Sequence, residues 1–322
     1  MFAEVSRPPQ ARVHTAAKTA GVTRAAPVAS VVVPTELSFP PIRRLGPGDL
    51  ARCVALSVDR GWMPDRAKWA LLLAASEVFG IDAPDGRGLA GSVTLTRWGA
   101  DYAAVGMMLA AARYERRGVG RALMEHALGA AGDGATVTLF ATDMGRPLYE
   151  KIGFAPVRRN VSFVGRFRAP SGHQGHGVRA ATEADLPAIL DLDRAAFGGD
   201  RGHIITRLPA FADRIAVAEV GGEDGQAVVG YAAAWRNAPA STVIGPLVAL
   251  DGETARRLVT ALAAGAPTPV RLDLDPDRAE LPGWADAHGL EPAGRTVAMA
   301  RGEVTGRGRQ GHLFAPISVA LA

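Results

Sequence analysis

The stretch AARYERRGVGRALMEHALGAAG, residues 111–132, decides how the rest of the chain is interpreted. Glycines at 118 and 120 interrupt a group of arginines, and apolar residues at helical spacing follow them. Because glycine has no Cβ, successive backbone N–H groups can converge there on one anion, just where a helix begins. Unpaired amides and the helix dipole attract phosphate, and the arginines add charge suited to a diphosphate. An ordinary strand-to-helix turn with solvated arginines is the alternative.

The residues before this turn predict a sheet. A strand is expected near residues 77–82, followed by a Pro-Asp-Gly hairpin turn and a strand in which Val93 and Leu95 alternate with Thr94 and Thr96. The run YAAVGMMLAA, residues 102–111, is almost unbroken in its apolar character, which is typical of a central strand covered on both faces. The turn lacks the GxxxxGK[ST] and GxGxxG spacings, so it is neither of those phosphate loops.

The second part of the chain repeats this order of elements. GVRAATEADLPAILDLDRAAF at 177–197 parallels the segment 41–62, and TVIGPLVALDGETARRLVTAL at 242–262 stands where the first part has its central strand and turn. Two units of one plan are the simplest explanation. We expect an extension over 1–38, a domain over 39–168, a linker over 169–177, a second domain over 178–303, and a tail over 304–322 that frays or folds back over a site.

Composition narrows the class of protein. The chain has 322 residues, 48% of them hydrophobic, which is enough for two domains with real cores. The formal net charge is only +4, and the dominance of arginine over lysine is interpreted as a bacterial type of base composition. One cysteine, Cys53, excludes an internal disulfide framework and a CxxC metal site. We therefore expect a cytoplasmic protein with no bound metal and no membrane partner; His173 and His176 fit a solvated linker better than a metal site.

The first thirty-five residues differ from the rest. They carry four basic residues against the single acid Glu4 and show no apolar periodicity, so we expect a disordered extension. A transit peptide and a nucleic-acid-binding arm are the alternatives. No aromatic side chains interleave the basic ones strongly enough to support nucleic acid as a partner, and none is expected.

Residues 115–128, ERRGVGRALMEHAL, resemble the pyrophosphate motif [QR]-x-x-G-x-[GA] of the GCN5-related N-acetyltransferases. The apolar strand VGMMLAA precedes the motif, and VTLFAT and RPLYEKIGF follow it; the last string is the most specific. The resemblance covers residues 41–167. Glu115 stands where the motif has Gln or Arg, which implies altered cofactor affinity and not its loss.

The resemblance implies two tandem α/β (α+β) domains, each with a mixed, mostly antiparallel sheet flanked by helices, and acetyl-CoA as cosubstrate. It places the pantetheine arm and thioester along a bulged fourth strand at Met108, Leu109 and Ala110. Tyr149 is implied as the general acid that protonates the departing thiolate; a half-buried helix tyrosine with a paired hydroxyl is the alternative. The resemblance places the diphosphate on the amides of Arg116, Arg117, Gly118, Val119, Gly120 and Arg121.

The acceptor side is less defined by the sequence. Glu77, Asp59 and Asp65 are candidates by position for a general base, although each one taken singly is better explained as a surface charge. The loop DRGWMPDRAKW lies where the fold builds its acceptor pocket, although core packing explains its tryptophans almost as well. The expected lining residues are Trp62, Trp69 and Met107.

The second unit lacks the features of a cofactor site. In ALDGETARRL, residues 249–258, acids replace arginines and only Gly252 remains, and its counterpart of the tyrosine helix has no tyrosine. We therefore predict an acetyltransferase whose first domain transfers an acetyl group directly to the amine of a small molecule. A CoA-binding regulatory or partner-binding module without turnover is the alternative, and the oligomeric state stays open.

Overall fold

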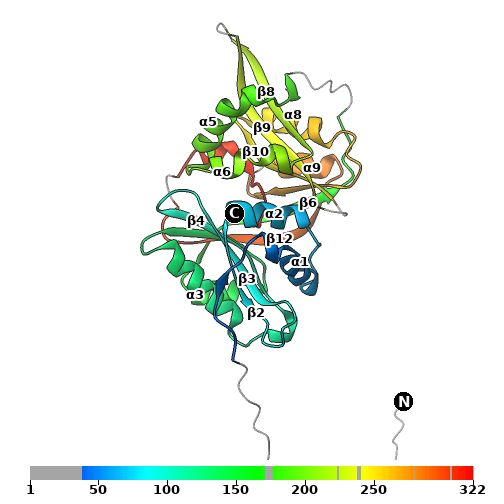
Figure 1. The fold of residues 1–322 in the computed structure, drawn as a ribbon. Coiled ribbons are helices and arrows are strands. Elements are labelled where there is room, and N and C mark those ends of the chain that lie inside the picture. The colour runs from blue at the N-terminus through cyan, green and yellow to red at the C-terminus, as the bar shows by residue number, and fades with distance from the viewer. Residues whose placement is uncertain are drawn as a thin grey trace, which may run out of the picture. The chain divides into compact units, whose positions relative to one another are not determined.

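The computed structural model describes residues 38–170, 177–222, 225–237, 241–278, 280–304 and 307–321. The extension expected over most of 1–38 and the linker histidines lie outside these ranges. We call residues 38–170 the first half and residues 177–321 the second half. Figure 1 shows the order of the elements in both halves.

The first half follows the predicted order of strands and helices. Short 3₁₀ turns precede α1 and lead from β4 toward α3. Its elements are β1 (Arg43–Arg44), α1 (Leu50–Asp59), α2 (Arg66–Ala75), β2 (Glu77–Asp82), β3 (Leu89–Arg97), β4 (Tyr102–Ala110), α3 (Val119–Ala131), β5 (Thr136–Ala141), α4 (Arg146–Lys151) and β6 (Ala155–Gly165).

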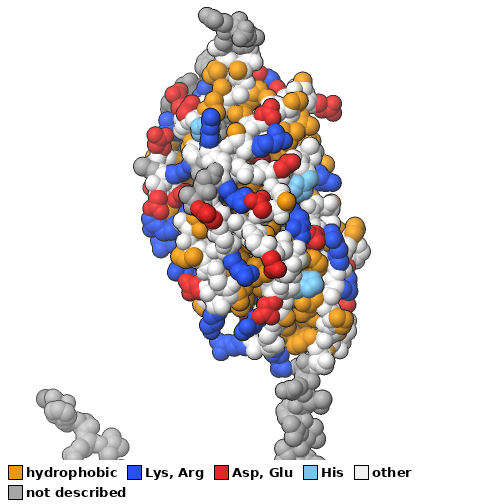
Figure 2. All heavy atoms as spheres, turned by 90° about the vertical axis from the view of Figure 1, so that its left-hand side faces the viewer, with side chains coloured by type: hydrophobic (Ala, Val, Ile, Leu, Met, Phe, Trp, Pro, Cys, Tyr) orange, Lys and Arg blue, Asp and Glu red, His pale blue; other side chains and the backbone are white. Residues whose placement is uncertain are grey.

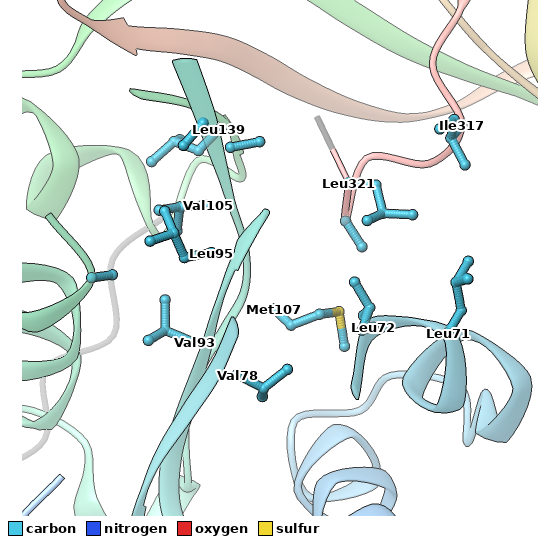
Figure 3. Close-up of a cluster of buried hydrophobic side chains, with 14 of the residues drawn as sticks. Leu71, Leu72, Val78, Val93, Leu95, Val105, Met107, Leu139, Ile317 and Leu321 are labelled. Carbon is cyan, nitrogen blue, oxygen red and sulfur yellow. The ribbon is translucent and has the colours of Figure 1, made fainter. Parts of the chain in front are cut away.

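Helices cover both faces of the β2–β4 sheet. Val93 and Leu95 face α3, while Met107 faces α2 on the other side (Figure 3). The alternation predicted for β3 correctly gives the two orientations of its side chains, but Thr94 and Thr96 are as buried as their apolar neighbours. Polar character therefore did not mark a solvent face here, because α1, α2 and the C-terminal residues cover it.

The second half repeats the plan, as the internal repeat predicted. In it, α8 packs on β8, β9 and β10 as α3 packs on β2, β3 and β4. Its elements are β7 (Val178–Ala180), α5 (Leu186–Phe197), α6 (Gly202–Ile205), α7 (Leu208–Phe211), β8 (Arg214–Gly222), β9 (Gly225–Asn237), β10 (Ser241–Ala249), α8 (Gly252–Ala263), β11 (Val270–Leu274), α9 (Glu280–Ala287), β12 (Glu291–Arg301) and β13 (Leu313–Ala315).

The two halves exchange their sixth strands. The described strands run in the order β1-β2-β3-β4-β5-β12-β6-β11-β10-β9-β8-β7, so β12 of the second half pairs with β5 and β6 of the first half pairs with β11. Strands β6 and β12 also pair antiparallel with each other between these two partners. The sheet is therefore continuous across the domain boundary that was expected between residues 168 and 178.

The last residues of the chain are packed against both halves. Strand β13 pairs with β10, and Ile317 and Leu321 are buried. A Cβ added at Gly106 of β4 would lie 1.8 Å from the carbonyl oxygen of Ala320, so this segment touches the backbone of the first half. The expectation of a fraying tail was wrong, because apolar side chains at 317 and 321 bury themselves beside Met107 and Leu72 (Figure 3).

Candidate functional site

The glycine turn presents a row of unpaired amides. None of the six N–H groups of residues 116–121 donates a hydrogen bond to another residue in the described part of the chain; the first bond of α3 is from Ala122 N–H to the carbonyl of Gly118. Gly118 has a φ of 81° and Arg116 a φ of 57°, so two residues of the turn occupy the left-handed region. A non-glycine residue in that region is strained, and such strain concentrates at functional sites.

Alternating backbone conformations of this kind turn successive N–H groups toward one point. The helix that follows adds the positive end of its dipole at the same point, since no side chain caps its first turn. Arg116, Arg117 and Arg121 are exposed around it. The turn thus has the donors, charge and open space that an anionic diphosphate requires.

The fourth strand is bulged beside this turn. Between the pairs Ser92↔Leu109 and Thr94↔Gly106, β4 has two residues where β3 has one. Met107, with a φ of 44°, lies in the bulge, and its carbonyl accepts a hydrogen bond from Ser92 Oγ at 3.1 Å. A bulge kinks a strand and re-aims its peptide groups, which is frequent next to binding sites.

Strands β4 and β5 separate after a short parallel ladder. Their pairing stops at Ala104↔Thr138, although β4 continues to Ala110 and β5 to Ala141. The edge of β4 that carries Met108, Leu109 and Ala110 therefore has no strand beside it on the β5 side among the described elements. An elongated ligand that leaves the turn can lie against this open edge.

The bulge, the turn and α4 converge at Gly120. A Cβ built on Gly120 would lie 3.4 Å from Met108 Sδ and 3.5 Å from Leu148 Cδ2. Tyr149, the next residue of α4, is buried and packs edge-on to Phe154. Its hydroxyl has no hydrogen-bond partner among the described residues, and burial raises the pKa of Tyr149 to about 12. The alternative, a helix tyrosine whose hydroxyl is paired with another side chain, therefore has no support from the described residues.

Two contacts tie the end of α1 to the segment that leads into the turn, and sequence reasoning missed both. Asp59 Oδ2 accepts a hydrogen bond of 2.7 Å from the N–H of Ala112, and Arg60 forms a 2.7 Å ion pair with Glu115. Glu115, which departs from the family motif, thus has a structural partner. Because the residues of each pair are more than fifty positions apart, nothing local in the sequence could have revealed them.

On the face of the sheet opposite α3, a buried apolar cluster covers the bulge. Leu71 and Leu72 of α2 converge there with Met107 and Leu321 (Figure 3). Trp62 is 42% exposed, whereas Trp69 is fully buried and donates to Ser57 Oγ at 2.8 Å. Of the expected lining residues, Met107 and Trp69 are therefore both buried in the core, and Trp62 alone of the three is exposed.

The structure does not bring the predicted carboxylates together at the bulge. Glu77 pairs with Leu95 in register and so shares the α3 face, opposite Met107. Its ion pair with Arg97 (2.8 Å) places it near the C-terminal end of α3, since Arg97 also binds the carbonyl of Ala130. Asp65 is 2% exposed and caps α2 through Lys68 N–H.

The equivalent cleft of the second half is filled by its own chain. Strands β10 and β11 pair only at residues 242–243, and β13 then pairs with β10 at Leu247 and Val248. At the helix start, the Asp251 carboxylate accepts the N–H of Thr254. A Cβ added at Gly252 would lie 2.1 Å from Glu280 Oε2, so a second carboxylate covers this helix end. In the second half, β13 thus lies where the edge of β4 is open in the first half, and the carboxylates of Asp251 and Glu280 lie where the first half has the unpaired amides.

Among the described residues, no group of three or more His, Cys, Asp or Glu side chains converges as metal ligands would. No described helix is both long enough and apolar enough to cross a bilayer. Basic and acidic side chains are interspersed over the face that carries α3 and α5 (Figure 2).

Two similar units, each a sheet with a bulged central strand that parts from its parallel neighbour, define an acyltransferase architecture. Family models described as acetyltransferase (GNAT) domain match residues 75–156 and 189–315. The chain belongs to the GCN5-related N-acetyltransferases and carries two of these domains in tandem, which confirms the predicted fold class. A curated relative, "Uncharacterized N-acetyltransferase YitH" of Bacillus subtilis, is 29% identical over 185 residues; the match covers 55% of this chain and 62% of that protein.

Solved structures share the tandem fold. A putative acetyltransferase from Pyrococcus horikoshii has a TM-score of 0.74 at 18% identity, covering 88% of this chain and 95% of that one. A tandem GNAT protein from the clavulanic acid biosynthesis pathway has a TM-score of 0.59 at 16% identity, covering 81% and 97%. At this level of identity the likeness concerns the fold alone.

Proposed function

We propose that the first half binds acetyl-CoA and transfers the acetyl group to the amine of a small molecule. The observation that carries this proposal is the row of six unpaired amides at residues 116–121, at the start of an uncapped helix. These amides and the arginines beside them would hold the diphosphate. Backbone groups of Met108, Leu109 and Ala110 would hold the pantetheine arm along the open edge of β4.

Bound acetyl-CoA supplies an activated acetyl thioester. As the C–N bond forms and the C–S bond breaks, the Tyr149 hydroxyl would give its proton to the thiolate that leaves. Its raised pKa, about 12, keeps this hydroxyl protonated at neutral pH, and it has no competing acceptor among the described residues. The acceptor would approach over the loop after α1, where Trp62 is exposed.

We propose no carboxylate as general base. Glu77 lies on the opposite face of the sheet, and the Asp59 and Asp65 carboxylates are engaged by backbone amides. The acceptor amine would then lose its proton to water or react in its neutral form. The second half would hold no cofactor, because β13 and two carboxylates occupy the corresponding cleft.

No free carboxylate lies at the bulge among the residues that the structure describes, which favours one alternative function, a CoA-binding regulatory or partner-binding module without turnover. Titration calorimetry with CoA, together with thiol release from acetyl-CoA over a panel of small amines, separates the two. Heat from CoA with thiol release supports the enzyme, whereas heat without release from any amine supports the module. No heat from CoA would reject both.

Replacing Tyr149 with Phe tests the proposed general acid. We expect kcat to fall roughly 100-fold while the Kd for CoA changes less than about twofold, because only the leaving-group proton is lost. Tyr114→Phe is the control, since Tyr114 is similarly buried in the turn before α3 and has no role in transfer. Equal kcat for Tyr149→Phe and native protein would exclude the role.

A further inference from the structure

The residues that follow β13 lie against the bulged strands of both halves. A Cβ built on Gly245, in the bulge of β10, would clash with the carbonyl oxygen of Pro316. A Cβ built on Gly106, at the edge of the bulge of β4, would clash with that of Ala320. Glycine permits backbones to approach this closely. We call residues 316–321 the strap, because they run from the bulge of the second half to the bulge of the first half.

The strap is held by backbone pairing at one end only. Before it, β13 pairs with β10 in the second half. Within it, the N–H groups of Leu321 and Ala320 donate to the carbonyl and hydroxyl oxygens of Ser318. Among the described residues, no hydrogen bond joins the strap to the first half, so apolar contacts hold it there. A segment held in this way opens at a lower free energy than the strands of the core.

The strap covers the face of β4 on which an acceptor would meet the thioester. Leu321 packs with Leu72 of α2 over Met107, the residue in the bulge (Figure 3). Met107 is only 3% exposed in this arrangement. An amine that reaches the bulge from this face therefore has to displace Leu321.

The covered face contains a polar group that the strap leaves unpaired. Thr94 pairs in register with Gly106, so its side chain shares the face that the strap covers. Its hydroxyl is buried and has no hydrogen-bond partner among the described residues. A buried polar group without a partner destabilises the arrangement that buries it. Opening of the strap would relieve this cost and leave the Thr94 hydroxyl free to pair with a polar acceptor.

We propose that the strap is autoinhibitory: it closes the first-half site in the free protein, and the acceptor amine displaces it. This inference rests on the proposed acetyl transfer, since it names the regulation of that same site. The apparent affinity for the acceptor is then reduced in proportion to the fraction of molecules in which the strap is open. Gly118 and the arginines of the diphosphate turn are exposed, so the affinity for CoA should not depend on the strap.

Leu321→Ser tests the proposal, because it removes the main apolar contact of the strap and leaves the groups proposed for transfer in place. Thiol release from acetyl-CoA is followed with the panel amine that the native protein acetylates fastest. We expect the KM for this amine to fall roughly 10-fold, with kcat and the Kd for CoA unchanged. Leu262→Ser is the control, since Leu262 is equally buried but belongs to a separate apolar cluster, and it should leave the KM unchanged.

Oxidation of Met107 by hydrogen peroxide reports opening without turnover. Peptide mass spectrometry compares its rate with those of Met144, which is 76% exposed, and Met124, which is fully buried in α3. In the native protein we expect Met107 to react more slowly than Met144 and faster than Met124. Leu321→Ser should raise the rate at Met107 roughly 10-fold and leave Met124 unchanged. Met107 as unreactive as Met124 in both proteins would overturn the proposal, because the strap would then be permanent core.

The two measurements distinguish failure of the strap from failure of the function on which it rests. A lower KM in Leu321→Ser, or thiol release that only this variant shows, supports both claims. An unchanged or higher KM, with thiol release by the native protein, would overturn autoinhibition and keep the acetyltransferase. No thiol release by either protein with any amine, with Met107 oxidised faster than Met124, would reject the proposed function and keep a strap that opens.

Discussion

A carboxylate placed at Gly120 should weaken binding of CoA roughly 100-fold without disturbing the fold. An added Cβ at this position makes ordinary contacts of 3.4–3.6 Å with Met108 and Leu148, so Gly120→Glu needs no movement of the backbone. Glutamate is also a better helix former than glycine. The new charge stands among the amides expected to hold the diphosphate. At about 5 Å and an effective dielectric of about 20, repulsion from one phosphate charge costs about 3 kcal/mol.

That penalty corresponds to roughly 100-fold weaker binding. Titration calorimetry with CoA at low salt measures it, because salt screens exposed charges. Gly120→Gln has the same size without the charge and separates sterics from repulsion. Gly129→Glu is the matched control, since Gly129 lies on the same helix with open space around it and distant from the turn. A Kd for Gly120→Glu within twofold of the Gly129→Glu value would refute the assignment of the turn.

Two further predictions concern stability. Hydrogen bonds from Arg43 hold the pKa of Asp49 at about 2, below its ordinary 3.8, so its contribution is complete above pH 4 and is lost as pH falls toward 2. Asp49→Asn should cost about 1–2 kcal/mol at pH 7 and flatten the acid side of the stability curve measured by urea unfolding; an unchanged curve would count against the pairing. Gly106→Ala should displace residues 317–321, because the added Cβ meets the Ala320 carbonyl at 1.8 Å, and should cost about 1–3 kcal/mol. Faster amide exchange at 317–321 checks this, with Gly129→Ala as the control; unchanged exchange would mean that the segment does not touch β4.

Local pattern was sufficient for the turn and the strands that lead to it. Glycine spacing and apolar periodicity act within a dozen residues, so they predicted the start of α3 near Gly118 and the buried run of β4. They also predicted the order of elements in the second half. The assignment of site roles to Met108, Tyr149 and the amides of the turn stays a prediction, although the structure brings these groups into one region.

The rest depended on contacts between distant residues. Glu77 is where the sequence predicted a strand to begin, but its pairing with Leu95 sets the face it occupies. Strands β6 and β12 carry similar patterns of polar and apolar residues, so nothing local reveals that each completes the sheet of the other half. The burial of residues 317–321 does have a local cause, because the string PISVALA at 316–322 is mostly apolar.

The exchange of β6 and β12 means that neither half of the chain has a complete sheet without the other. Each half contributes one strand to the sheet of the other half. A fragment that contains one half alone would therefore expose an unpaired strand edge and would be prone to aggregate. The second half is thus indispensable to the first even if it never meets a ligand. The cleft of the second half, which β13 and Glu280 already fill, can therefore change in sequence without loss of the shared sheet.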